Sequence, residues 1–237
     1  MCLIALAHRV SEAFPFVLAA NRDEDYDRPT HEAHDWSGRE DIVGGRDGLH
    51  GGTWLAMRRG GRFAAVTNLH GAERRKRSRG FLVRDFVTGE AEVKAYADEI
   101  AREAEAYAGF HLIAGQAAGE LMYITPEVQR PLDDGLHAFS NAPAGEAWPK
   151  TEYAIERLRS ALAIANVEAL VDELMRFLCT VRGTGDVQSE VFIAGERYGT
   201  RSSTVIVATQ TEILFAEQSF ARGGAAHGQR RLFCLVR

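Results

Sequence analysis

The sequence predicts an α+β protein built from two mainly antiparallel sheets that pack together, with helices on the outside. Short apolar runs bounded by turns occur near both ends of the 237-residue chain, and longer helical patterns lie between them. Most neighbouring strand patterns are joined by short turns, which favours antiparallel pairing. No repeat, low-complexity linker or change in composition marks a boundary, so we expect one domain over residues 1–237.

The first part of the chain predicts strands and then helices. Strands are expected where apolar runs are bounded by polar turns, at residues 2–7, 16–20, 53–58 and 62–69. The last two flank Arg59-Gly60-Gly61, which is typical of a hairpin turn. Helices are expected where apolar residues recur at helical spacing, at residues 81–87 and 91–108.

The remainder alternates between the two kinds of element. Strands are expected at residues 110–114, 121–124 and 135–141, and again at 203–208, 213–218 and 231–236. Two helices are expected between these groups, at residues 150–165 and 166–178, with Thr151 as an N-cap. Residues 181–188 are the most loop-like stretch of the chain.

Composition excludes several classes of protein. The net charge is −5, from 28 basic and 33 acidic residues, whereas a general nucleic-acid binder is expected to be clearly basic. No apolar run approaches the roughly 20 residues that span a bilayer, and the short apolar start is followed by His8 and Arg9 rather than a signal-peptide core. The three cysteines are scattered and form no disulfide framework, so we expect a reducing, cytoplasmic location.

Cys2 is the first candidate for chemistry. If Met1 is removed, the chain begins with a residue that carries both a thiol and a free α-amine. The reference pKa of an α-amine is about 7.7–8.0 and that of a thiol about 8.5, so the amine accepts the thiol proton near neutral pH. With Met1 attached, the same nitrogen is an amide and cannot act as a base. The alternative interpretation is a small buried core residue.

Several short motifs occur together with Cys2. Asn21-Arg22-Asp23-Glu24 follows the second predicted strand, and the chain also contains Gly51-Gly52-Thr53-Trp54-Leu55, Ser140-Asn141-Ala142 and Tyr198-Gly199-Thr200-Arg201. Their joint order resembles the NRDE family, also called the transport and Golgi organisation family, over residues 2 to about 218. That family is similar to N-terminal-nucleophile amidohydrolases of the bile-salt hydrolase and penicillin V acylase type. The resemblance implies a four-layer α-β-β-α sandwich, with Cys2 at the end of a central strand attacking linear amide bonds.

Arg22 and Asp23 are candidate partners of Cys2. A cation near a thiol lowers its pKa, which is the role expected for Arg22, and a carboxylate holds an ammonium, which is the role expected for Asp23. Adjacent strand residues face opposite sides, so both serve one site only where the strand ends or bulges. A surface ion pair is the alternative, and Glu24 and Asp25 remain substitutes.

Three further candidates come from other segments. Asn141 and Asn68 each lie at the end of a predicted strand and are expected to donate hydrogen bonds to a developing oxyanion. For Asn141 the alternative is a turn residue before Pro143. Arg201 begins an apolar strand and is expected to pair with the acid of the second strand or to keep the surroundings of the cysteine positive. Its alternative is a strand-end residue whose guanidinium reaches water.

Other patterns predict structure rather than a site. Gly44-Gly45 and Gly51-Gly52 are expected in loops and lack the Gly-Lys-Ser/Thr ending of a phosphate loop. The stretch containing His31, Glu32, His34 and Asp35 lacks the spacing of a known metal motif, so a solvated loop is favoured over a metal site. The basic run over residues 74–79 is expected to be an exposed loop, and Trp54 is expected in the core.

Two functions are compatible with these patterns. The first is a cysteine amidohydrolase or acyltransferase acting on a small or amphipathic molecule, for which no cofactor is required. The second is a cytosolic, non-catalytic carrier that binds haem or a lipid or acyl-CoA ligand in the same cleft. Haem iron would be bound through Cys2 or a histidine, although the chain lacks the Cys-x-x-Cys-His motif.

Overall fold

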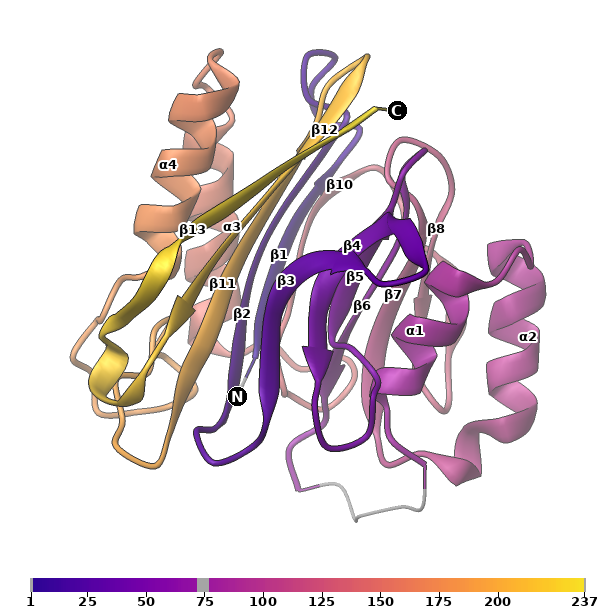
Figure 1. Cartoon of the computed structure of the whole chain (residues 1–237), viewed down its shortest axis with the longest axis horizontal. Coiled ribbons are helices and arrows are strands. Elements are labelled where there is room, and N and C mark those ends of the chain that lie inside the picture. The colour runs from indigo at the N-terminus through magenta and orange to yellow at the C-terminus, as the bar shows by residue number, and fades with distance from the viewer. Residues whose placement is uncertain (1, 72–76, 237) are drawn as a thin grey trace. The chain divides into compact units, whose positions relative to one another are not determined.

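The computed structural model describes residues 2–71 and 77–236. It divides into two compact units, one formed by Met1–Arg28 with Asp134–Arg237 and the other by Pro29–Asp133. Each unit contains one antiparallel sheet and two of the four α-helices (Figure 1). The α+β class with two antiparallel sheets is therefore confirmed, while the expectation of a single domain stays a prediction.

The first unit carries a six-stranded sheet in the order β10-β1-β2-β11-β12-β13. Its strands are β1 (Leu3–His8), β2 (Phe16–Asp25), β10 (Gly135–Phe139), β11 (Tyr198–Ala208), β12 (Glu212–Phe220) and β13 (Ala226–Val236). Figure 1 shows α3 (Pro149–Ala161) and α4 (Val167–Leu178) beside this sheet, and a short 3-10 helix, η2 (Arg222–Gly224), precedes β13. The edge strand β13 is mostly exposed.

Alternation along β1 and β2 decides what each face of this sheet carries. The side chains of Leu3, Ala5, Val17 and Ala19 pack in one core cluster with α3 and α4. Leu3 pairs with Asn21 in the register of β1 and β2, so the even-numbered residues point to the opposite face. Both faces are buried along β1. The sheet therefore positions polar residues at its end on two distinct sides.

The second unit carries a seven-stranded sheet whose strands follow sequence order from β3 to β9. These strands are β3 (Thr30–Trp36), β4 (Arg39–Asp47), β5 (Leu55–Arg58), β6 (Arg62–Asn68), β7 (Phe110–Gln116), β8 (Leu121–Ile124) and β9 (Gln129–Pro131). The helices α1 (Gly80–Thr88) and α2 (Val93–Glu103) pack on one face through a cluster that includes Leu82, Phe86 and Ile100, and the 3-10 helix η1 (Ala104–Ala106) follows α2.

Most predicted strands and all four helices are confirmed, with ends shifted by a few residues. The solvated loop expected around His31 is wrong, because β3 and β4 form a paired hairpin there. Gly44 and Gly45 lie within β4 rather than in a loop. A Cβ atom on Gly45 would lie 2.2 Å from the Trp54 ring, so the absent side chain makes room for that half-buried indole.

Two other expectations are corrected or left aside. The N-cap of α3 is Trp148 rather than Thr151, because Pro149 begins the helix and fixes its first turn. Thr151 instead donates its Oγ1 hydrogen to the Trp148 carbonyl at 2.7 Å. The expected exposed basic loop lies partly at residues 74–76, outside the described residues. Among the described residues, none of the helices is both long enough and apolar enough to cross a bilayer.

Candidate functional site at the end of the six-stranded sheet

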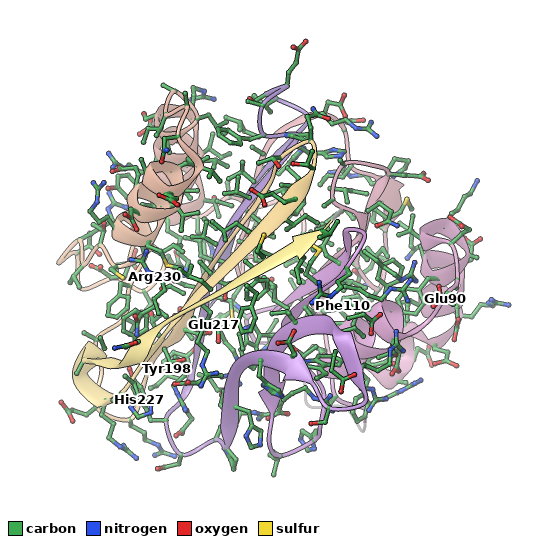
Figure 2. The ribbon with its side chains drawn as sticks, turned by 45° about the horizontal axis from the view of Figure 1, so that its top comes forward. Glu90, Phe110, Tyr198, Glu217, His227 and Arg230 are labelled. Atoms are coloured by element: carbon green, nitrogen blue, oxygen red, sulfur yellow. The ribbon has the colours of Figure 1, made fainter. Side chains whose placement is uncertain are left out.

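Cys2 lies directly before β1 and is half-buried. Its Sγ lies 3.9 Å from the carbonyl oxygen of Asp23, and Tyr198 (Figure 2) donates its hydroxyl hydrogen to the same oxygen at 3.2 Å. Burial raises the pKa of the Cys2 thiol, and the charge of Asp23 raises it further, whereas that of Arg22 lowers it. Burial and the Asp23 charge therefore favour the protonated thiol, whereas the Arg22 charge and the hydrogen bond to the Asp23 carbonyl oppose them.

Arg22 and Asp23 point to opposite faces of the sheet, as strand alternation requires. Arg22 is buried opposite Ser202, and Asp23 is paired with Thr200, whose Oγ1 donates to Asp23 Oδ1 at 2.7 Å. The register between β2 and β11 shifts between Thr200 and Ser202, which makes a bulge at Arg201. Both charges still act on Cys2, because all three residues share the end of two neighbouring strands.

Asn21 has a structural role. Its Nδ2 donates to the carbonyl oxygens of Leu178 and Val191, both at 2.8 Å, and its Oδ1 accepts from Ser203 Oγ at 2.6 Å. These bonds tie the centre of the sheet to the end of α4 and to the segment after it. Asn21, the first residue of the Asn-Arg-Asp-Glu motif, thus stabilises the sheet face next to the helices. Arg22 lies on the opposite face.

Asn141 reaches the same end of the sheet from β10. Phe139 pairs with Ile4 in the antiparallel register of β10 and β1. Continuing that register by two residues places Asn141 opposite Cys2. The Asn141 side chain is buried. Asn68 ends β6 in the second unit, and its proposed role beside Cys2 stays a prediction.

Arg201 makes contacts other than the expected acid pair. Its Nη1 donates to the carbonyl oxygens of Asp25, Tyr26 and Arg28 at 3.0–3.2 Å. Its guanidinium also lies 5.3 Å from the centre of the Tyr26 ring. Arg201 therefore holds the chain segment that leaves β2, which fixes the end of the strand carrying Arg22 and Asp23.

The buried polar residues of this unit include several that the sequence pattern did not single out, among them Lys150, Ser202 and Glu217. Ser202 faces Arg22, and its Oγ has no hydrogen-bond partner within the described ranges. Glu217 (Figure 2) lies on β12 and accepts from Thr204 Oγ1 at 3.1 Å. The sequence does contain a signal for Ser202, because polar residues recur at every second position of β11. Lys150 gave no comparable signal, since lysine near a helix end is usually exposed.

The arrangement brings a thiol, a guanidinium, a carboxylate and an amide to one end of the six-stranded sheet. These are the groups needed for nucleophilic attack on a carbonyl and for stabilising the oxyanion that results. Over residues 2–71 and 77–236, no group of three or more His, Cys, Asp or Glu side chains is placed to hold a metal ion.

Two solved structures share this fold at low sequence identity. An N-acylethanolamine-hydrolyzing acid amidase ortholog from Caenorhabditis elegans superposes with a TM-score of 0.53 and 14% identity, covering 87% of this chain and 92% of that chain. A variant of the conjugated bile acid hydrolase from Clostridium perfringens gives a TM-score of 0.54 and 10% identity, covering 98% and 92%. These likenesses confirm the expected N-terminal-nucleophile hydrolase-like fold.

Sequence comparison identifies nearer relatives. The Transport and Golgi organization protein 2 homolog of Bos taurus is 31% identical over 244 residues, covering 87% of each chain. The Homo sapiens homolog is 29% identical over 254 residues, covering 93% of this chain and 92% of that protein. The family model described as "Transport and Golgi organisation 2" matches residues 1–222. The chain therefore belongs to the Transport and Golgi organisation 2 family.

Proposed function

We propose that this protein is an amidohydrolase or acyltransferase that attacks a linear acyl amide with the Cys2 thiolate. The observation that carries the proposal is the position of Cys2 Sγ beside the Asp23 carbonyl, at the sheet end that also holds Arg22 and Asn141. Two proteins of this fold are named as hydrolases of N-acylethanolamines and of conjugated bile acids, which supports acyl-amide chemistry by analogy.

The proposed reaction begins with loss of the thiol proton to the α-amine of Cys2, once Met1 has been removed. Sγ then forms a bond to the carbonyl carbon, and Asn141 Nδ2 donates to the oxyanion. The oxyanion collapses, the amide C–N bond breaks, and the amine leaves with the proton held by the α-amine. Water or a second nucleophile then releases the acyl group from the thioester.

A panel of fluorogenic N-acyl amides of increasing acyl length tests the proposal. Protein freed of Met1, as checked by intact mass, is expected to release fluorophore and to carry a transient acyl adduct on Cys2. Cys2→Ala is expected to remove both signals, whereas Cys179→Ala, which changes an exposed cysteine, is expected to keep them. Turnover that survives in Cys2→Ala would rule out Cys2 as the nucleophile.

The runner-up function is a non-catalytic carrier of an amphipathic ligand. It is favoured by one observation: burial raises the pKa of Cys2, which keeps the thiol protonated and unreactive. The same observation disfavours haem bound through Cys2, because the iron ligand would be the thiolate. A haem titration followed by absorption tests this alternative, and the lack of a saturable shift at low micromolar haem would count against it. The cytoplasmic location stays a prediction.

A further inference from the structure

Lys150 is a fully buried lysine whose Nζ has no hydrogen-bond partner among the described residues. Its exposed fraction is 0%, and no described residue accepts a hydrogen bond from its Nζ. The ring centre of Trp148 lies 5.5 Å from that nitrogen. The backbone of Lys150 is fixed in the first turn of α3, where its N–H donates to the Gln188 carbonyl at 3.2 Å. The ring of Trp148 attracts an ammonium, but within the described ranges no hydrogen bond compensates the burial of its charge.

Three influences act on the charge of this amine. Burial lowers the pKa of Lys150, and the positive end of the α3 dipole acts in the same direction. The negative charges of Asp23, Cys2 and Asp186 oppose these two effects, because they favour the ammonium. Lys150 therefore belongs electrostatically to the end of the sheet that carries Cys2.

The residue type itself supports a proton-carrying role. Lysine occurs at only three positions of the chain, 76, 94 and 150, and the other basic residues counted among the 28 are all arginine. An arginine remains protonated in a protein, whereas a buried lysine gives up its proton readily. The buried basic position on which the charges of Asp23 and Cys2 act is thus occupied by a side chain that can exist without charge.

We propose that Lys150 exchanges a proton with the Cys2 thiol, directly or through one water molecule. The S–H bond of Cys2 breaks and an N–H bond forms on the neutral Lys150 amine, which leaves a thiolate and an ammonium. The Asp23 carboxylate stabilises that ammonium, and Arg22 stabilises the thiolate. This inference rests on the proposed role of Cys2 as a nucleophile, and it provides a base that does not depend on a free α-amine.

The pH dependence of the pair involves charges from several elements. Asp23 on β2 acts on both groups, Arg22 on β2 acts on Cys2, and Asp186 in the segment before β11 acts on Lys150. Substitutions of Cys2 and Lys150 leave these neighbouring charges in place. The effect of one group on the other is therefore measurable as a reciprocal change in titration midpoint.

Carbon NMR of protein labelled at the lysine ε-carbon tests the pair without any substrate. With three lysines in the chain, the Lys150 signal is assigned by its loss in Lys150→Met. We expect Lys150 to titrate below the exposed Lys94 and its midpoint to fall further in Cys2→Ala, because the thiolate no longer favours the ammonium. A Lys150 midpoint equal to that of Lys94, or unchanged in Cys2→Ala, would overturn the proposal.

Alkylation of Cys2 gives the reciprocal measurement in a Cys179→Ser, Cys234→Ser background. Lys150→Met is expected to move the rise in alkylation rate to higher pH, so that the rate near pH 7.5 falls about tenfold if the pKa of the thiol rises by about one. Lys94→Met is the matched control and is expected to leave the profile unchanged. Identical profiles for Lys150→Met and the background would refute the exchange. If both measurements succeed while no amide is cleaved, the proposed function fails and the proton pair stands.

Discussion

Thr200 Oγ1 donates a hydrogen bond to Asp23 Oδ1 over 2.7 Å, and both side chains are buried. The same Oγ1 accepts a hydrogen bond from the Ile193 N–H at 2.9 Å. One hydroxyl therefore connects β11, the end of β2 and the segment that precedes β11. It fixes the orientation of the carboxylate that acts on both Cys2 and Lys150.

Replacing Thr200 tests the contribution of this hydroxyl. Thr200→Val keeps the shape of the side chain but leaves a buried carboxylate oxygen and a backbone N–H without this partner. We expect the free energy of unfolding to fall by about 1–3 kcal/mol in urea denaturation. Thr200→Ser retains the hydroxyl and is expected to lose clearly less. Equal losses in the two variants would show that the methyl group, and not the hydrogen bonds, is responsible.

The sequence was most informative where strands are buried on both faces. The apolar runs of β1, β2, β6 and β7 have both faces buried, so hydrophobicity alone located them. It failed for β3, whose exposed face carries charged and histidine side chains that are typical of a loop. It also failed at Gly45, because the reason for that glycine is a ring nine residues away along the chain.

The candidate site was predictable only in part. The Asn-Arg-Asp-Glu motif and Cys2 were found from the sequence, but the separation of structural Asn21 from Arg22 required the register of β1, β2 and β11. The burial of Lys150 depends on how α3 packs against the sheet, which no local pattern records. The contacts of Arg201 with three carbonyl oxygens depend on the turn that follows β2.

Arg201 provides a second test. One nitrogen, Nη1, makes all three carbonyl contacts, so a lysine ammonium with its three donors is able to replace it. We expect Arg201→Lys to change the free energy of unfolding by less than about 1 kcal/mol, and Arg201→Met to lower it by about 1–3 kcal/mol. Thermal denaturation measures both. If Arg201→Lys is as damaging as Arg201→Met, the planar contact with Tyr26 is the more important one.

Gly45 tests the packing of the second unit. An alanine Cβ there would meet the Trp54 ring at 2.2 Å and the His31 carbonyl oxygen at 2.9 Å. We expect Gly45→Ala to lower the free energy of unfolding by about 1–3 kcal/mol and to alter Trp54 fluorescence. A smaller residue at position 54 relieves the ring contact, so Gly45→Ala is expected to cost less in a Trp54→Leu background. Equal costs in both backgrounds would place the strain at His31 instead.

The final prediction concerns the stability of the protein as a function of pH. Burial lowers the pKa of Lys150 below its unfolded value of about 10.4, so between these two values the unfolded chain binds more protons than the folded one. The free energy of unfolding therefore rises with pH in that window through Lys150. Cys2 acts in the opposite sense, because its pKa is raised in the folded chain. Above about pH 8.5 the folded chain therefore binds more protons than the unfolded one, and the free energy of unfolding falls with pH through Cys2.

Comparison with Lys150→Met separates the lysine from the other titrating groups. The wild-type protein carries the penalty of a buried ammonium at low pH and loses it as Lys150 becomes neutral, whereas the methionine variant carries no such penalty. We expect the stability of the wild type relative to Lys150→Met to increase with pH from the lowered pKa of Lys150 up to about pH 10.4, the unfolded value, as measured by urea denaturation at each pH. Lys94→Met removes an exposed lysine and is expected to give a flat difference over the same range. A flat difference for Lys150→Met as well would mean that Lys150 has the same pKa in the folded and unfolded chains. Groups other than Asp23 and Cys2 would then offset the cost of burying its charge.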